Sequence, residues 1–327
     1  MTNKESNPSK QDISKNAKKQ EGLSMLDAIL NGDVPIIVTE EQENQGYSVD
    51  KCPYGICNGS GLIIVEVDGE DMAKNCQCCE DKILLHKKEN SNIREDYYYA
   101  EIQNLREIDV TLLTPKKQVA PRKTDKRIKD KNNIPPEKTD AYIARVYDEK
   151  KVEKGIKFFA TQYTNKTLLY LEEEPRTRSR NLMLIGQSGR QKTYLACAIA
   201  TEFLKKEKSV YFTTMQDLIN HVYDEKVDLD KIMTEIDLLI IDELGKEYHT
   251  DSEWAMKMMM DLFRKRKNRN LPIICTSNYY PNAWEELYDP SFNSVLNGSF
   301  FITLLESDMD FRIEQIEDSI NDYDFFD

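Results

Sequence analysis

The stretch NLMLIGQSGRQKT at residues 181–193 decides the fold of this chain. An apolar run is followed by a glycine-containing turn and then by Lys192 and Thr193, which open a helical pattern. A phosphate cradle needs inward backbone N–H groups, a helix N-terminus, a lysine for the β- and γ-phosphates and a hydroxyl for Mg²⁺. The stretch therefore predicts a P-loop that binds ATP and Mg²⁺, with contacts from Gly186, Gln187, Ser188, Gly189, Arg190, Gln191, Lys192 and Thr193.

Two later stretches strengthen this prediction, since a single motif match can arise by chance. Residues 237–245, DLLIIDELG, predict a buried strand that ends in Asp242 and Glu243. We expect Asp242 to hold Mg²⁺ through water and Glu243 to orient and deprotonate the attacking water. Residues 271–278, LPIICTSN, predict another short strand, which places Asn278 where a sensor of the γ-phosphate would lie.

Length and composition limit the other possibilities. The 327 residues suit about two domains, and 31% of them are charged. No apolar run approaches the ~20 residues that span a bilayer, and the N-terminus carries no hydrophobic signal core, so we expect a cytoplasmic protein. The net charge of −13 argues against indiscriminate binding of nucleic acid, although a local basic patch is compatible with it.

Shifts in composition divide the chain into segments. We predict a mobile leader over 1–45, a cysteine-rich module over 46–114, a basic linker over 115–140, an ATPase domain over 141–312 and an acidic tail over 313–327. Strand and helix patterns alternate in the ATPase domain, which is typical of a parallel α/β sheet with helices on both faces. Strands are expected at 181–185, 209–213, 237–242, 272–276 and 299–304, and helices at 192–206, 215–225 and 252–268.

The cysteine-rich module predicts a structural zinc site. It contains Cys52 and Cys57, a glycine turn, a hairpin pattern, and then Cys76, Cys78 and Cys79. A module of this size cannot bury a sufficient core, and four thiolates on Zn²⁺ would supply the missing folding free energy. We assign Cys52, Cys57, Cys76 and Cys78 as ligands, with Cys79 competing for the fourth place and free surface thiols as the alternative. Two further cysteines, at 197 and 275, are expected in the core.

Taken together, these motifs resemble the replicative-helicase loaders of the DnaC/DnaI type, which are close relatives of the IstB transposition ATPases. The resemblance is weak over residues 50–105 and good over 150–315. It implies an AAA+ type P-loop core with strand order 5-1-4-3-2. It also implies a zinc-bearing module that grips a DnaB-type hexameric helicase, and contact with single-stranded DNA. Arg312 matches the sensor-like arginine of the family.

This chain departs from the family pattern at two places. Gln191 replaces the usual glycine, and a side chain there can crowd the phosphates and restrict the backbone, so we expect reduced nucleotide affinity. Residues 283–311 contain no Arg or Lys that could act as an arginine finger, so the finger is either absent or supplied by Arg264, Arg266 or Arg269. Hydrolysis is therefore expected to be weak.

Three functions remain open at this point. The leading one is an ATP-dependent helicase loader in DNA replication, since the transposition relatives generally lack a zinc module. The second is an IstB-like ATPase that assists transposition. The third is an interaction adaptor that does not hydrolyse ATP. The basic linker, with a net charge of +5 over residues 116–140, is the best local candidate for contact with phosphates.

Overall fold

The computed structural model of the protein describes residues 52–57, 59–67, 70–115, 147–176, 180–247 and 253–312. The predicted leader and tail lie outside these residues, as does the linker beyond Pro115. Across the described part of the chain, no helix combines the length and the apolar character needed to cross a membrane.

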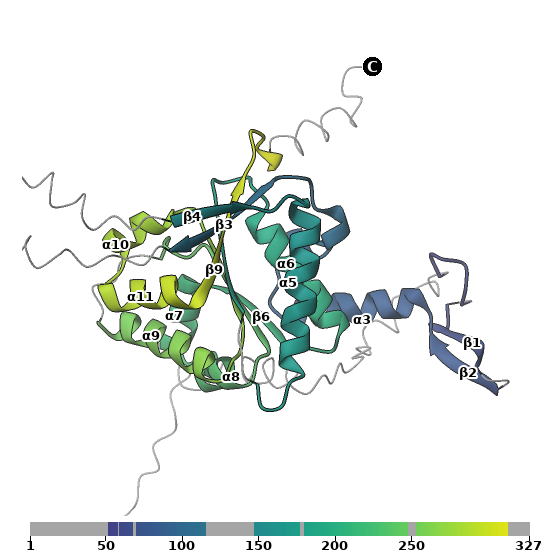
Figure 1. The fold of residues 1–327 in the computed structure, drawn as a ribbon. Helices are drawn as coiled ribbons and strands as arrows, with labels where there is room; N and C mark the ends of the chain where they lie inside the picture. Colours follow the sequence, from purple (N-terminus) through teal and green to yellow (C-terminus); the bar gives the residue numbers. More distant parts are fainter. Residues whose placement is uncertain are drawn as a thin grey trace, which may run out of the picture.

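A seven-stranded sheet forms the centre of the molecule (Figure 1). Its strand order is β4-β3-β9-β5-β8-β7-β6, and the five strands from β9 to β6 are parallel. These five are β5 (Asn181–Ile185), β6 (Val210–Thr214), β7 (Leu238–Asp242), β8 (Ile273–Ser277) and β9 (Phe300–Glu306). In chain order they run 5-1-4-3-2 across the sheet, so the predicted fold class is confirmed.

Two antiparallel strands extend this sheet beyond β9. They are β3 (Asp109–Pro115), which pairs with β9, and β4 (Tyr147–Lys151), which pairs with β3. The sequence patterns did not identify either strand, and β4 is polar with mostly exposed residues, as suits a sheet edge. β3 belongs by number to the segment predicted as the cysteine-rich module, but it completes the sheet of the ATPase.

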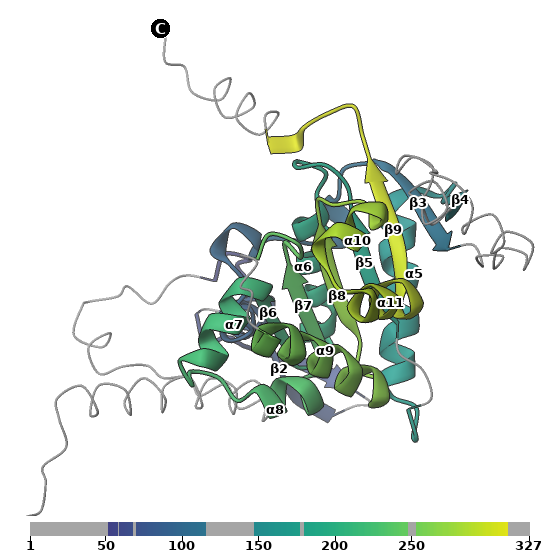
Figure 2. The same cartoon turned by 90° about the vertical axis from the view of Figure 1, so that its left-hand side faces the viewer.

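Helices cover both faces of the sheet because its central strands are apolar on both sides. Leu182 and Leu184 pack against one core with α5 (Gly155–Leu171) and α6 (Lys192–Lys205). Met183 and Ile185 face the other core, which lies under further helices (Figure 2). These are α7 (Met215–Tyr223), α8 (Leu229–Thr234), α9 (Glu253–Asn268), α10 (Trp284–Leu287) and α11 (Pro290–Ser299). The alternation is the period-two pattern of a doubly covered strand.

The cysteine-rich part projects from the α5/α6 side of this domain (Figure 1). It contains the predicted hairpin, β1 (Leu62–Val67) with β2 (Glu70–Asn75), and a longer helix, α3 (Gln77–Asn90). The C-terminal part of α3 packs on α6, where Lys88 is buried and donates to the carbonyl of Tyr98. Short 3-10 turns at Glu95–Tyr97 and Ile102–Asn104 then lead along α6 to β3.

Candidate nucleotide site and cysteine cluster

Two glycines allow the phosphate loop to pass close to the end of the sheet. Gly186 has a φ of +151°, and a Cβ there would lie 2.4 Å from the carbonyl oxygen of Leu305. Gly189 has a φ of +75°, and a Cβ there would lie 1.9 Å from a carboxylate oxygen of Asp310. Any side chain at either position would collide with β9 or with the segment that follows it.

Lys192 is the first residue of α6 and lies folded over the loop. Its Nζ donates to the carbonyl oxygens of Gly186, at 2.9 Å, and Gln187, at 2.7 Å. Burial lowers the pKa of Lys192 to about 8, while the Asp242 carboxylate acts in the opposite direction. The ammonium is therefore held in the loop by two neutral carbonyl oxygens. An anionic ligand can take their place as the acceptor.

Asp242 ends β7 and receives two hydroxyl groups on one oxygen. Thr193 Oγ1 donates to Asp242 Oδ1 at 2.9 Å, and Thr276 Oγ1 donates to the same atom at 2.6 Å. Burial raises the pKa of Asp242, and the two hydroxyl hydrogen bonds oppose that rise. Oxygen ligands of this kind suit a hydrated Mg²⁺, so the residues present fit the expected ion.

Thr276 was not among the assigned site residues, yet it joins the β7 and β8 parts of the site. Its hydroxyl oxygen also accepts the backbone N–H of Glu243 at 2.9 Å. This bond holds Glu243 where its φ is +58°, a conformation uncommon for a residue other than glycine. The sequence signal for the joining of β7 and β8 by Thr276 was a threonine at the end of a predicted buried strand.

The side chains of Glu243 and Asn278, two of the expected catalytic residues, have different partners. The Glu243 carboxylate forms a salt bridge with Lys246 at 2.6 Å, and both side chains are partly exposed. Asn278 Nδ2 lies 3.5 Å from Ser188 Oγ, which puts the proposed sensor beside the phosphate loop. The structure thus brings Glu243 and Asn278 to the same end of the sheet as Lys192.

The segment after β9 lies on the phosphate loop from the other side. The backbone N–H of Phe311 donates to the Gly189 carbonyl at 3.2 Å, and Arg190 donates to the carbonyl of Met309. Arg312 is exposed, and its charge contributes to lowering the pKa of Lys192. Its backbone N–H donates to Asp310 Oδ1 at 3.0 Å, and the sensor role of Arg312 stays a prediction.

Arg266 does not fit the role of an arginine finger. Its side chain is fully buried, and it donates to the carbonyl oxygens of Ile232, at 2.5 Å, and Pro272, at 2.9 Å. Burial lowers the pKa of Arg266 to about 9. The guanidinium joins α9 to the loops before β7 and β8, whereas Arg264 and Arg269 are exposed.

Substitution of Arg266 by methionine is expected to destabilise the domain by roughly 1–3 kcal/mol, because it removes the donor to the buried carbonyl of Ile232 and one of two donors to the carbonyl of Pro272, which also accepts the N–H of Leu239. Chemical denaturation followed by circular dichroism would measure this. Arg264→Met, on the exposed face of the same helix, is the matched control and should change stability by no more than about 0.5 kcal/mol. Equal stability of the two variants would contradict the structural role.

Gln191 adopts the left-handed conformation that glycine usually supplies at this position. Its φ and ψ are 56° and 19°. The side-chain amide makes a pair of hydrogen bonds with one backbone unit: Oε1 accepts the N–H of Arg106 at 3.0 Å, and Nε2 donates to the carbonyl of Arg106 at 3.1 Å. The side chain is thus held by Arg106 and does not hang over the loop.

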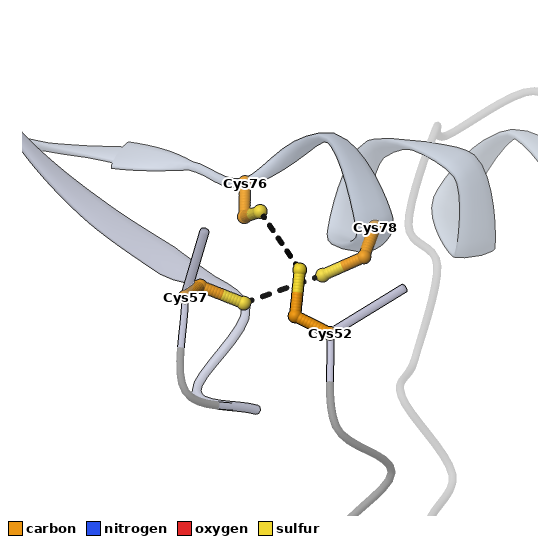
Figure 3. Close-up of side chains that lie close together, drawn as sticks. All are labelled: Cys52, Cys57, Cys76 and Cys78. Carbon is orange, nitrogen blue, oxygen red and sulfur yellow. Dashed lines mark hydrogen bonds between the residues drawn. The ribbon is translucent and has the colours of Figure 1, made fainter. Parts of the chain in front are cut away.

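The four cysteines assigned as ligands converge on one point (Figure 3). The sulfur atoms of Cys52, Cys57, Cys76 and Cys78 all lie within 4.8 Å of one another. The distance from Cys52 Sγ to Cys76 Sγ is 3.7 Å, and that from Cys57 Sγ to Cys78 Sγ is 3.4 Å. Tetrahedral zinc with Zn–S bonds of ~2.3 Å requires sulfur atoms ~3.8 Å apart, so the cluster fits this ion.

The cluster also distinguishes between the competing cysteines. Cys78 belongs to the converging set, whereas Cys79 lies against Gly61 instead. Backbone N–H groups of Cys57 and Ile56 lower the pKa of the Cys52 thiol to about 6, which favours the thiolate that a metal requires. As expected, Cys197 and Cys275 are buried in the cores of the ATPase.

Comparison with known proteins supports the assignment of the nucleotide site. Residues 143–296 match the family described as IstB-like ATP binding protein. The insertion sequence IS232 ATP-binding protein of Bacillus thuringiensis subsp. berliner is 33% identical over 138 residues, which cover 40% of this chain and 52% of that protein. The corresponding IS5376 protein of Geobacillus stearothermophilus is 30% identical, with 42% and 54% covered. The chain spans about half the length of these relatives.

Two solved structures show a limited similarity to this chain. The crystal structure of DnaI is 23% identical, with a TM-score of 0.38, and the match covers 46% of this chain and 85% of that one. The crystal structure of the DnaC helicase loader is 18% identical, with a TM-score of 0.41, and the match covers 65% of this chain and all of that one.

Proposed function

We propose that this protein is an ATP-dependent loader that recruits a replicative helicase of the DnaB type and helps to place it on single-stranded DNA. The observation that carries the ATP-dependent part is the convergence of Thr193 and Thr276 on Asp242 beside Lys192. Lys192 and the loop would hold the β- and γ-phosphates, and Thr193 and Asp242 would hold the hydrated Mg²⁺. The bound ion would neutralise charge on the transferring phosphoryl group.

Glu243 is the residue proposed to orient and deprotonate the attacking water. It directly follows the last residue of β7, and its backbone N–H is held by Thr276, so the side chain starts from a fixed point. In this structure Glu243 pairs with Lys246, whose side chain is partly exposed and can move aside. A contact between Lys246 and a phosphate would release Glu243 for this role.

Glu243→Gln is expected to lower ATP turnover about 100-fold, because general-base catalysis typically contributes that much or more. ADP affinity should stay nearly unchanged, since Glu243 does not contact the loop. A phosphate-release assay and calorimetric titration measure the two quantities. Glu286→Gln, an exposed carboxylate on α10, serves as the control. Unchanged turnover in Glu243→Gln would remove Glu243 from the mechanism.

The cysteine cluster supports the loader over other ATP-dependent roles. Its four cysteines lie before β1 and at the start of α3, outside the residues that match the IstB-like family, so the cluster is an addition to the matched region. Its hairpin projects into solvent with Ile64 and Met72 exposed at 75% and 52%. Such a projecting, metal-stabilised module is suited to contact a protein partner, which we propose is the helicase.

An IstB-like role in transposition is the second candidate. It is favoured by the family match and by relatives whose names refer to insertion sequences. Capture experiments with the full-length protein and ATP would separate the two: the host replicative helicase and single-stranded DNA in one arm, a transposase and duplex DNA in the other. Retention of the helicase alone would support the loader, and retention of the transposase alone would support transposition. ATP binding without turnover would favour the third candidate, an adaptor.

A further inference from the structure

The segment that joins the cysteine cluster to the ATPase wraps around the helix of the phosphate loop. We call residues 91–108 the collar. The carbonyl of Ser91 accepts the N–H of Phe212 on the edge strand β6 at 2.9 Å. Farther along, Thr201 Oγ1 on α6 donates to the Ala100 carbonyl at 2.9 Å. The collar therefore touches the sheet edge and the middle of α6 before it reaches the phosphate loop.

Gln191 makes the contact between the collar and the loop. The paired hydrogen bonds with Arg106 described above join residues 85 positions apart in the chain. Arg106 reaches the loop in a second way, because its guanidinium lies 5.7 Å from the ring centre of Phe311, whose N–H donates to Gly189. The collar is thus connected to both ends of the turn that precedes Lys192.

The backbone conformation of Gln191 costs free energy, which the contact with Arg106 can offset. For a residue with a Cβ, the left-handed conformation costs free energy. This cost is large enough to change the equilibrium constant between two loop conformations about tenfold. Glycine, the usual residue before the lysine, does not bear this cost. Here the residue that bears this cost is the one whose side chain is bonded to Arg106 of the collar.

We infer that Gln191 is a positioning residue: it uses the backbone of Arg106 to hold the phosphate loop in its nucleotide-binding conformation, so that nucleotide affinity and docking of the collar depend on each other. The inference rests on the proposed binding of ATP. The dependence is reciprocal by linkage, since a ligand that needs the docked collar must also stabilise it. Because α3 continues into the collar, the cysteine cluster is mechanically connected to the nucleotide site.

Two substitutions at this position separate the inference from a purely structural role. Gln191→Ala removes the amide but keeps the Cβ, and it is expected to weaken ADP binding about tenfold. Gln191→Gly also removes the amide but no longer strains the backbone, so it should bind ADP at least as tightly as the wild type. Calorimetric titration of the full-length protein with ADP and Mg²⁺ measures both affinities. A role confined to fold stability predicts equal affinities in all three proteins.

Hydrogen exchange at the Arg106 amide provides an independent measurement. This N–H is bonded to Gln191 Oε1, so ADP should slow its exchange in the wild type and have little effect on it in either variant. Thermal unfolding checks that the variants fold. If Gln191→Ala does not fold, the comparison of Arg106 exchange in the wild type and in Gln191→Gly tests the inference. Equal ADP affinity of Gln191→Ala and the wild type would overturn the inference, as would Arg106 exchange that ADP leaves unchanged. Failure of the wild type to bind any nucleotide would instead contradict the proposed function.

Discussion

Lys192→Ala is expected to lower nucleotide affinity about 1,000-fold, or ~4 kcal/mol, because it removes two charge-assisted hydrogen bonds from the most anionic part of the ligand. In the free protein this ammonium contacts only the carbonyls of Gly186 and Gln187. Asp242 keeps its hydrogen bonds from Thr193 and Thr276 when Lys192 is replaced, so the domain should remain folded. Calorimetric titration with ADP and a non-hydrolysable ATP analogue, both with Mg²⁺, measures the change.

Lys206→Ala is the matched control for this experiment. Lys206 caps the other end of the same helix and is exposed, so its substitution removes the same charge far from the loop. Its nucleotide affinity should equal that of the wild type. Binding by Lys192→Ala at wild-type strength would contradict the nucleotide site, and the adaptor function would then take the place of the ATP-dependent loader.

Cys52→Ser is expected to remove the metal and to unfold the cysteine-rich part of the chain while the ATPase sheet stays intact. Metal binding by four thiolates contributes on the order of 10–16 kcal/mol in small zinc peptides, and the hairpin has little other core. Elemental analysis of protein made in zinc-replete medium should give about one zinc per wild-type chain. Circular dichroism and limited proteolysis report which part unfolds.

Cys79 provides a control from the same helix. It is adjacent to Cys78 but lies outside the converging set, so Cys79→Ser should retain the metal. Loss of zinc in both variants would show that the ligand set has been assigned incorrectly. Absence of zinc in the wild type would contradict the metal site itself.

The positions of the parallel strands and the main parts of both sites could be predicted from local sequence, whereas the order of the strands was expected only from the resemblance to a known family. Backbone turns, a strand end and the first turn of a helix are set by neighbouring residues. The spacing of residues within 181–193 and 237–245 therefore predicts a nucleotide site. The converging cysteines likewise follow from two short segments on either side of a hairpin. These features depend on interactions that the chain makes over short distances.

Other features depend on pairs of residues that only the fold brings together. Gln191 bonds to Arg106 at a separation of 85 residues, and Arg266 bonds to Ile232 and Thr276 to Asp242 at separations of 34 residues each. The same holds for β3, which shows no clear pattern of its own but pairs with β9 near the end of the described chain. A side chain that can donate or accept hydrogen bonds has many possible partners in sequence. Packing of the sheet and helices selects one, and that selection makes Arg266 a buried structural residue and Gln191 a contact between the collar and the phosphate loop.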